Sequence, residues 1–239
     1  MAGTLTKISP KDLVKRIMDG ERDFSSTRLS GALDDEAGYA GLDAYLRDRD
    51  LRAETLTAAG SDWSGLRARG LFFPFSKLAG INPSRSDLRG ADFRRTDFTG
   101  ANLEGADLTG ATVIGCRFQE ANLAGATLRA TDFYEASLTG AKLRGADLTR
   151  AFLLRLAFRE ADLSGAVLTG AIMYRADLRG VVGLDKVTDL GTVTFHQTIV
   201  TAAEQAIIDA ALGGMPFFDV RSESAYLTED RGRRTRPDR

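Results

Sequence analysis

Residues Ser86–Gly180 constrain the fold more than any other part of the chain, because they repeat one five-residue phrase nineteen times without a break. Typical copies are ADLTG and ANLEG. The central position, here called i, is always apolar, and Gly is the commonest residue at i+2. Position i−2 is small in every copy but one, where it is Leu156. A period of five fits neither a helix of period 3.6 nor an uninterrupted strand.

The spacing of the phrase predicts a chain that winds. In an extended chain alternate side chains share a face, so i−2 and i point one way and i−1 points the other. The pair i+1 and i+2 must then bend the chain, and Gly at i+2 tolerates the backbone angles of a bend. Successive coils should pair through their backbones at about 4.8 Å, with i and i−2 side chains filling the interior.

This pattern resembles the pentapeptide repeat proteins, whose phrase is A-(D/N)-L-x-x. The resemblance implies an all-β solenoid, namely a right-handed quadrilateral β-helix with four phrases per coil and a rod that is often dimeric. The residues at the two ends of the chain add short N- and C-terminal helices to this expectation. With four phrases per coil, every fourth phrase lies on the same wall. We therefore expect one internal file of stacked side chains from Leu103, Leu123, Leu143 and Leu163.

The N-terminal residues predict a cap for the coil. We expect a capping helix within residues 1–21, because Ser9 suits the N-cap, Pro10 suits the first helical position, and Leu13 and Ile17 share one apolar face. Such a helix would cover the open end of a β-helix, whose backbone groups would otherwise be unpaired.

The repeat begins irregularly. Residues 22–60 predict imperfect first repeats with a loop near 33–43, and Leu46, Leu51 and Leu56 fit position i of a weak phrase. Ala59 and Gly60 then indicate a register shift of two residues. Regular β-helix is predicted over 61–185.

The phrase stops after Gly180. Residues 186–227 predict a C-terminal segment with a helix over 201–212, opened by a capping box of Thr201 and Glu204. The stretch TVTFHQTIV within it predicts a short strand pair or a loop. The polar tail 228–239 is predicted to be disordered.

One wall of the predicted coil is apolar on its outer surface, whereas the other three carry polar, charged or small residues. Its outward residues, here called the apolar stripe, are Ile114, Tyr134, Phe152, Leu154, Ile172 and Tyr174. Phe72 and Pro74 point outward upstream on the same side. Exposed apolar patches mark contact surfaces, and burying six such side chains is worth roughly 9–18 kcal/mol before ordering costs. Something should therefore cover the stripe.

Two coverings stay open at this point. The chain's own C-terminal segment can fold back, with Ile207, Ile208 and Leu212 of the predicted helix, and Phe217–Phe218, as apolar partners. Alternatively, the stripe binds a second copy or a partner protein, and the same helix can serve as a dimer contact.

The charge balance gives no general attraction to nucleic acid or to anionic membranes. The chain holds 33 acidic and 32 basic residues, and Ser86–Gly180 holds twelve of each. One cysteine excludes an intramolecular disulfide and any multi-cysteine metal site. There is no apolar signal-peptide core and no run of eighteen apolar residues, so we expect a cytoplasmic protein without a membrane span.

No residue pattern indicates catalysis. The single His196 lies in an irregular stretch, and a lone histidine is more often structural. Cys116 replaces Ala at an inward i−2 position and is expected to be a small core residue. The aspartates at i−1 recur with the phrase and mark no particular pocket. We expect no catalytic, cofactor-binding or metal site, and no enzyme.

The sequence therefore favours a non-enzymatic scaffold that binds a protein partner or a second copy through an outer wall. The resemblance implies an alternative, because some pentapeptide repeat proteins mimic a DNA duplex, bind DNA gyrase or topoisomerase IV and protect them from quinolone-type poisons. Such mimicry needs a strongly acidic rod. The neutral repeat region argues against it.

Overall fold

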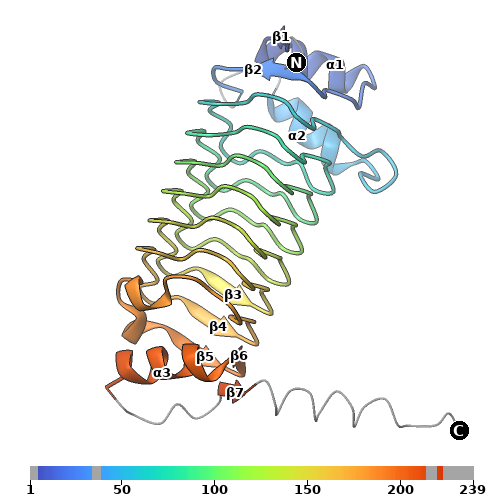
Figure 1. Ribbon diagram of the computed structural model, residues 1–239. Helices are drawn as coiled ribbons and strands as arrows, with labels where there is room; N and C mark the ends of the chain where they lie inside the picture. Colours follow the sequence, from blue (N-terminus) through green and yellow to red (C-terminus); the bar gives the residue numbers. More distant parts are fainter. Residues whose placement is uncertain (1–4, 34–38, 214–219, 223–239) are drawn as a thin grey trace, which may run out of the picture.

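The computed structural model describes residues 5–33, 39–213 and 220–222, and its main feature is a regular coil (Figure 1). Position i−1 of each phrase pairs in parallel with the residue one coil further on, as in Asp87 with Asp107 and Asn102 with Asn122. The partners are twenty residues apart, so four phrases complete one coil. The fold is a β-helix with four walls.

The corner of each phrase adopts the left-handed backbone conformation that favours glycine. Gly90 has φ 65° and Gly110 has φ 67°. The bend is closed by a backbone hydrogen bond, for example from the Ala91 N–H to the Leu88 carbonyl at 3.1 Å. Arg95 and Arg150 occupy the same corner with φ 58° and 57°, where an L-residue costs about 1–2 kcal/mol.

The interior is filled as the phrase predicts. Both i and i−2 side chains are buried throughout the regular coils. Leu103, Leu123, Leu143 and Leu163 are fully buried at equivalent positions of successive coils, which confirms the predicted internal file. Some of the large side chains stack as aromatic pairs, as with Phe98 and Phe118, whose rings lie 5.0 Å apart and 4° from parallel.

Several polar residues at i−2 are satisfied by the preceding coil, whereas the buried Ser76 Oγ has no hydrogen-bond partner. The Thr96 hydroxyl donates to the Phe73 carbonyl at 2.9 Å, and the Cys116 thiol to the Phe93 carbonyl at 2.8 Å. These bonds remove the cost of a buried polar group. Leu156 is fully buried in the same type of position, and nothing in the structure explains its size.

The N-terminal end of the coil is covered by α1 (Pro10–Met18) (Figure 1). The helix begins at the predicted cap, where the Ser9 Oγ accepts a hydrogen bond from the Asp12 N–H at 3.0 Å. Its residues Leu13, Val14 and Ile17 are buried. Beside it, β1 (Thr6–Ile8) pairs in parallel with β2 (Thr27–Leu29).

The irregular first repeats differ from the prediction. Thr57 pairs with Lys77, and Leu56 and Ala58 are both buried, so the register is already regular there and does not shift at residues 59–60. Where the sequence predicted a loop near 33–43 and an inward Leu46 of a repeat, the structure has α2 (Tyr39–Arg47). Residues 34–38 lie outside the described part.

The reason for this error is a coincidence of spacing. Leu46, Leu51 and Leu56 are five residues apart and imitate the phrase. Leu42 and Leu46 are four apart, however, and form the buried face of α2, which packs against α1. Asp23 pairs with Thr57 across this excursion.

The coil also extends further than the predicted end at residue 185. Val182 pairs with Asp162 and Thr188 with Val167. Next, β5 (Thr194–His196) joins β3 (Phe152–Leu154) and β4 (Ile172–Tyr174) in a parallel sheet of order β3-β4-β5.

The stretch TVTFHQTIV is therefore neither a loop nor a strand pair. It forms β5 and then β6 (Thr198–Val200), which pairs with β7 (Val220–Ser222), while Ile199 also pairs with Asp177 of the preceding coil. The short 3-10 helices η1 (Leu184–Lys186) and η2 (Leu190–Thr192) lengthen this coil and hide the phrase.

The C-terminal helix α3 (Ala202–Ala211) lies across the other end of the coil (Figure 1). It begins with the predicted capping box of Thr201 and Glu204. It contacts η1, η2 and β6, with Ile208 buried and Ile207 and Leu212 partly buried against the core. The helix does not lie on the apolar stripe, so that form of covering is wrong; Phe217–Phe218 lie outside the described residues.

Candidate interaction surface

The stripe lies on one continuous wall of the coil. Parallel pairing links Phe72 to Asp92, Asp92 to Thr112, Thr112 to Asp132 and Asp132 to Phe152. From Phe152 the wall continues as the sheet β3-β4-β5, where Phe152 pairs with Ile172 and Leu154 with Tyr174. The sequence-predicted stripe residues are thus brought together in register.

The downstream part of this wall is uncovered by any described residue. Phe152 is 44% exposed and Ile172 is 39% exposed, and the two are register partners on neighbouring strands. Ile114, Tyr134, Leu154 and Tyr174 are half-buried. Among the described residues, the other large hydrophobic side chains of comparable exposure are Met18 and Val182. Among the described residues, Phe152 and Ile172 are therefore the one pair of exposed large hydrophobic side chains that lie next to each other.

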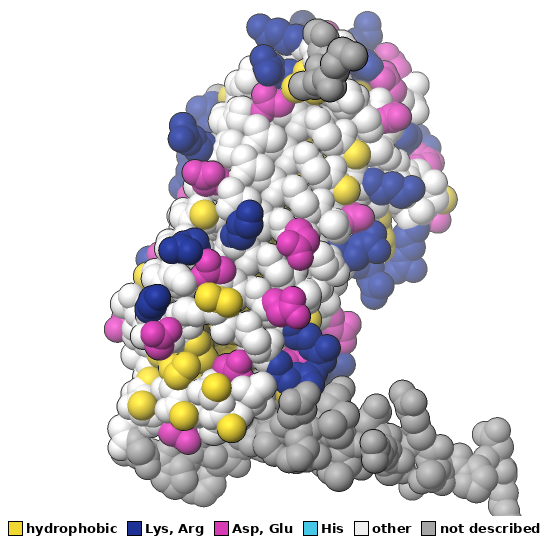
Figure 2. Space-filling view, viewed as in Figure 1, with side chains coloured by type: hydrophobic (Ala, Val, Ile, Leu, Met, Phe, Trp, Pro, Cys, Tyr) yellow, Lys and Arg dark blue, Asp and Glu magenta, His cyan; other side chains and the backbone are white. Residues whose placement is uncertain are grey.

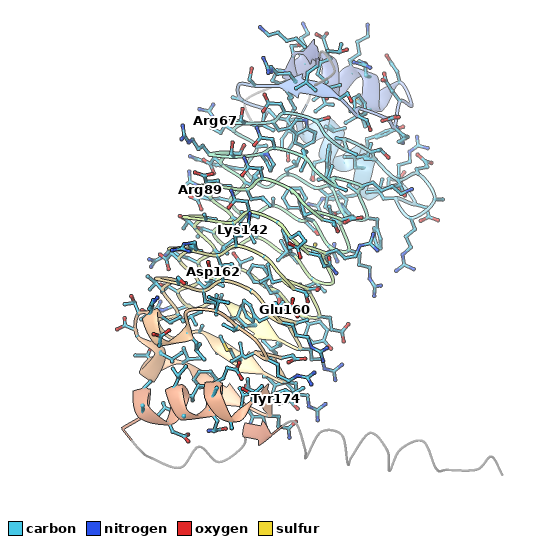
Figure 3. All side chains as sticks on the ribbon, in the orientation of Figure 1. Arg67, Arg89, Lys142, Glu160, Asp162 and Tyr174 are labelled. Atoms are coloured by element: carbon cyan, nitrogen blue, oxygen red, sulfur yellow. The ribbon has the colours of Figure 1, made fainter. Side chains whose placement is uncertain are left out.

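The sequence analysis did not assign His196 to this wall. His196 pairs in register with Tyr174, and their rings stack at 5.1 Å and 14° (Figure 3 labels Tyr174). The signal was present, because Phe195 is buried like an i residue and Gln197 has the corner conformation with φ 51°. Recognising FHQ as the end of a phrase would have placed His196 at i+1.

The upstream part of the wall is covered by the chain itself. Phe72 is 8% exposed and Pro74 is buried. The Arg47 guanidinium lies 4.1 Å from the centre of the Phe72 ring, and that of Arg52 lies 5.0 Å from the Phe75 ring. The covering segment is α2 and the turn after it. The sequence analysis expected the C-terminal segment to cover this wall, but in the structure the N-terminal excursion covers its upstream part.

A cleft of about 410 Å³ lies between this segment and the wall. Figure 2 shows Lys and Arg side chains gathered on the same side of the molecule, over and beneath the α2 region. The lining residues that carry charge are Arg47, Arg49, Asp50, Arg52, Arg94 and Arg95. Among these lining residues arginine outnumbers acid five to one.

Some of these arginines are paired and some are not. Arg47 binds Asp43 at 2.8 Å and Arg94 binds Asp92 at 2.7 Å, and these hydrogen bonds raise the pKa of both guanidiniums. Arg49 lies 3.9 Å from Glu54, which is 38% exposed. Within the described part of the chain, Arg52 and Arg95 have no carboxylate within 4.0 Å.

Arginines also border the stripe further downstream. Arg155 pairs with Glu135 at 3.0 Å and lies 5.7 Å from the centre of the Tyr134 ring. Arg175 lies 5.2 Å from the Tyr174 ring and donates from Nε to Gln197 at 2.6 Å. The exposed apolar side chains therefore have a cationic edge.

The carboxylates of the other walls are largely paired. Arg117 binds Asp97 at 2.7 Å, Arg129 binds Asp147 at 3.1 Å and Arg144 binds Asp162 at 3.2 Å. Asp162 follows Lys142 on the wall that faces the viewer in Figure 3. Arginine side chains therefore offset many of the described carboxylates of these walls.

The described residues show little that would support catalysis or metal binding. Burial raises the pKa of the Cys116 thiol to about 12, so the nucleophilic thiolate is not formed near neutral pH. No group of three His, Cys, Asp or Glu residues in the described ranges could hold a metal ion. None of the helices described here is long and apolar enough to cross a membrane.

Comparison with known families identifies the repeat. The profile of the family described as "Pentapeptide repeats (8 copies)" matches residues 76–113, 116–153 and 157–182, all within the coil. The chain belongs to the pentapeptide repeat proteins. Among curated proteins, no match is found.

Several solved structures are similar. A pentapeptide repeat protein from the thylakoid lumen of Arabidopsis thaliana is 31% identical over 40% of this chain and 66% of that one, with a TM-score of 0.39. One from Nostoc is 40% identical over 36% of this chain and 69% of that one, with a TM-score of 0.34. Full-length QnrB1, a plasmid-mediated fluoroquinolone resistance protein, is 15% identical over 97% and 98% of the two chains, with a TM-score of 0.41.

Proposed function

We propose that this protein is a non-enzymatic scaffold that binds another protein through the apolar stripe. The observation that carries the proposal is the exposed pair Phe152 and Ile172, which no described residue covers. Removing such side chains from water is favourable by about 25 cal/mol per Å². The proposal includes a cytoplasmic location and a right-handed coil.

Binding fits this molecule better than catalysis does. The interior is packed with i and i−2 side chains and leaves the outer walls to act. The cleft beside α2 contains arginines, one aspartate and apolar residues, but no cysteine, histidine or serine that could act as a nucleophile or general base. A repetitive, flat wall suits a protein contact.

The direct test is affinity capture from a lysate of the source organism, with the tagged full chain as bait. Phe152→Asp combined with Ile172→Asp should reduce retention of the partner at least about tenfold, because it places two charges in an apolar contact. Val182→Asp is the matched control, since Val182 is 54% exposed at i−1 on another wall. Equal capture by all three baits would contradict the proposal.

The same variants decide whether the partner is a second copy. Light scattering of the purified wild type would then give twice the monomer mass, and the double variant alone would fall to the monomer mass. A monomeric wild type that still captures a protein identifies a different partner.

DNA mimicry is disfavoured by the paired carboxylates of the polar walls. A rod that competes with DNA must present unpaired negative charge. We expect micromolar protein to leave gyrase supercoiling unchanged, with or without ciprofloxacin. Protection of gyrase in that assay would overturn this expectation.

A further inference from the structure

The positive cleft opens directly onto the apolar stripe. Ile114 is both a lining residue of the cleft and the first residue of the stripe. Thr112 beside it pairs with Asp132, and Asp132 pairs with Phe152. A ligand that occupies the cleft can therefore continue along the wall without a break.

The arginines of the cleft are held in place and carry donors suited to carboxylates. Arg47 and Arg52 are held against aromatic rings at 4.1 Å and 5.0 Å, which restrains their guanidinium planes before any ligand arrives. Arg52 and Arg95 have no carboxylate partner among the described residues, so their donors can face a ligand. Guanidinium groups bind carboxylates through two parallel hydrogen bonds, which is a strong and specific contact.

We propose that this cleft anchors the acidic end of a partner peptide whose apolar side chains then lie along the stripe. The proposal rests on the proposed function and gives the chemistry of the partner. The coil steps from Ile114 to Tyr174 span about 14 Å at 4.8 Å each. That length matches about ten residues of helix at 1.5 Å per residue, with the acidic end extending further into the cleft.

The charges and shapes of the cleft and the stripe disfavour other occupants. Nucleic acid carries phosphate along its whole length, whereas Leu154, Ile172 and Phe152 offer it no charge. The chain's own tail, residues 228–239, holds five arginines against three acids and would be repelled. A second copy would bring the same arginine-bordered wall against itself.

The probes for the test are two fluorescein-labelled peptides of 16 residues. Each carries leucines at helical spacing and a block of four glutamates, placed at the N-terminal end in one and at the C-terminal end in the other, so that both directions along the wall are sampled. Fluorescence anisotropy with the full chain measures their affinity. We expect at least one of them to bind, and to bind at least about tenfold more tightly than its Gln-for-Glu counterpart.

The protein variants locate the contact. Arg52→Gln combined with Arg95→Gln should weaken binding of the acidic peptide at least about tenfold and remove its advantage over the Gln peptide. The matched control is Arg85→Gln, because Arg85 occupies the equivalent corner of a wall that does not adjoin the stripe, with φ 56° against 58° for Arg95. Arg85 lies over Gly105 of the next coil, just as Arg95 lies over Gly115.

Each outcome is decisive. No binding of either acidic peptide, unchanged binding by the cleft variant, or an equal loss in Arg85→Gln would overturn the proposal that the cleft binds carboxylates. A single-stranded oligonucleotide that binds as tightly as the peptide, with the same arginine dependence, would replace the peptide as ligand. If Phe152→Asp with Ile172→Asp abolishes capture while the arginine variant leaves peptide binding unchanged, the proposed scaffold function stands. The proposal that the cleft binds carboxylates then fails.

Discussion

The two ends of one wall behave differently although they have the same geometry. Upstream, Phe72 and Pro74 are buried beneath α2 and the turn after it. Downstream, Phe152 and Ile172 occupy the same i−1 position as Phe72 but are exposed. A wall of this coil can therefore serve as part of the core or as a surface, and an inserted segment decides which.

The difference arises from where the chain departs from its phrase. The chain leaves the coil after Ala32, which still pairs with Arg67, and has returned to it at Thr57. The excursion contains the covering helix α2 with its buried residues Leu42 and Leu46. In the last coil, η1 and η2 instead form contacts with α3 at the end of the molecule. The upstream wall thus gains a cover that the downstream wall does not receive from any described segment.

The largest predicted contrast is between two phenylalanines. Phe72→Ala should lower the free energy of unfolding by about 3 kcal/mol or more, because it leaves a cavity under α2. Phe152→Ala should cost much less, about 1 kcal/mol or below, since that side chain is 44% exposed and its removal encloses no cavity. Urea unfolding measures both. Equal losses would mean that the downstream wall is also covered.

A slightly smaller effect is predicted for the cover itself. Leu42→Ala removes a fully buried side chain of α2 and should cost about 2–4 kcal/mol. Hydrogen exchange should then accelerate in residues 39–52 and stay unchanged in β3 and β4. Asp48→Ala, an exposed change in the same segment, is the control. Faster exchange across the whole coil would refute the separate cover.

The half-buried stripe residues should give an intermediate result. Tyr134→Asp combined with Leu154→Asp should lower the melting temperature by a few degrees, because each charge replaces a side chain that packs against the wall. Calorimetry and light scattering measure stability and mass. If neither the melting temperature nor the mass moved relative to Val182→Asp, the stripe would have no structural or associative role.

The smallest effect concerns acid. The hydrogen bond from Arg89 lowers the pKa of Asp87, and that from Ser164 lowers the pKa of Asp162. Since the folded pKa lies below the unfolded one, this stability is present above about pH 4 and is lost as the pH falls through the folded value. Asp87→Asn with Asp162→Asn should flatten the decline of the urea midpoint below pH 4. An unchanged decline would show that other groups control it.

The coil could be predicted because its phrase states which side chains point inward. Leu103 and its equivalents, the Ser9 cap and the Thr201–Glu204 capping box all follow from local spacing and side-chain chemistry. The stripe followed from the same register once four phrases per coil were assumed. Local rules suffice where each residue's position depends only on its own phrase.

The remaining features depend on contacts distant in sequence. Leu46, Leu51 and Leu56 imitate a phrase, so α2 was hidden until its packing against α1 was known. The extra residues of η1 and η2 interrupt the five-residue phrase before His196. For this reason the sequence analysis did not place His196 on the wall. Likewise, the cleft requires α2 and the wall to be adjacent, and no short-range pattern reports that adjacency.

The most direct test of a binding role places a photocrosslinker on the bare wall. The chain would carry p-benzoylphenylalanine at position 152 or at the control position 182 and be irradiated inside cells of its source. The account predicts a discrete protein adduct from position 152 that position 182 does not give. No adduct at 152, or the same adducts from both positions, would contradict it.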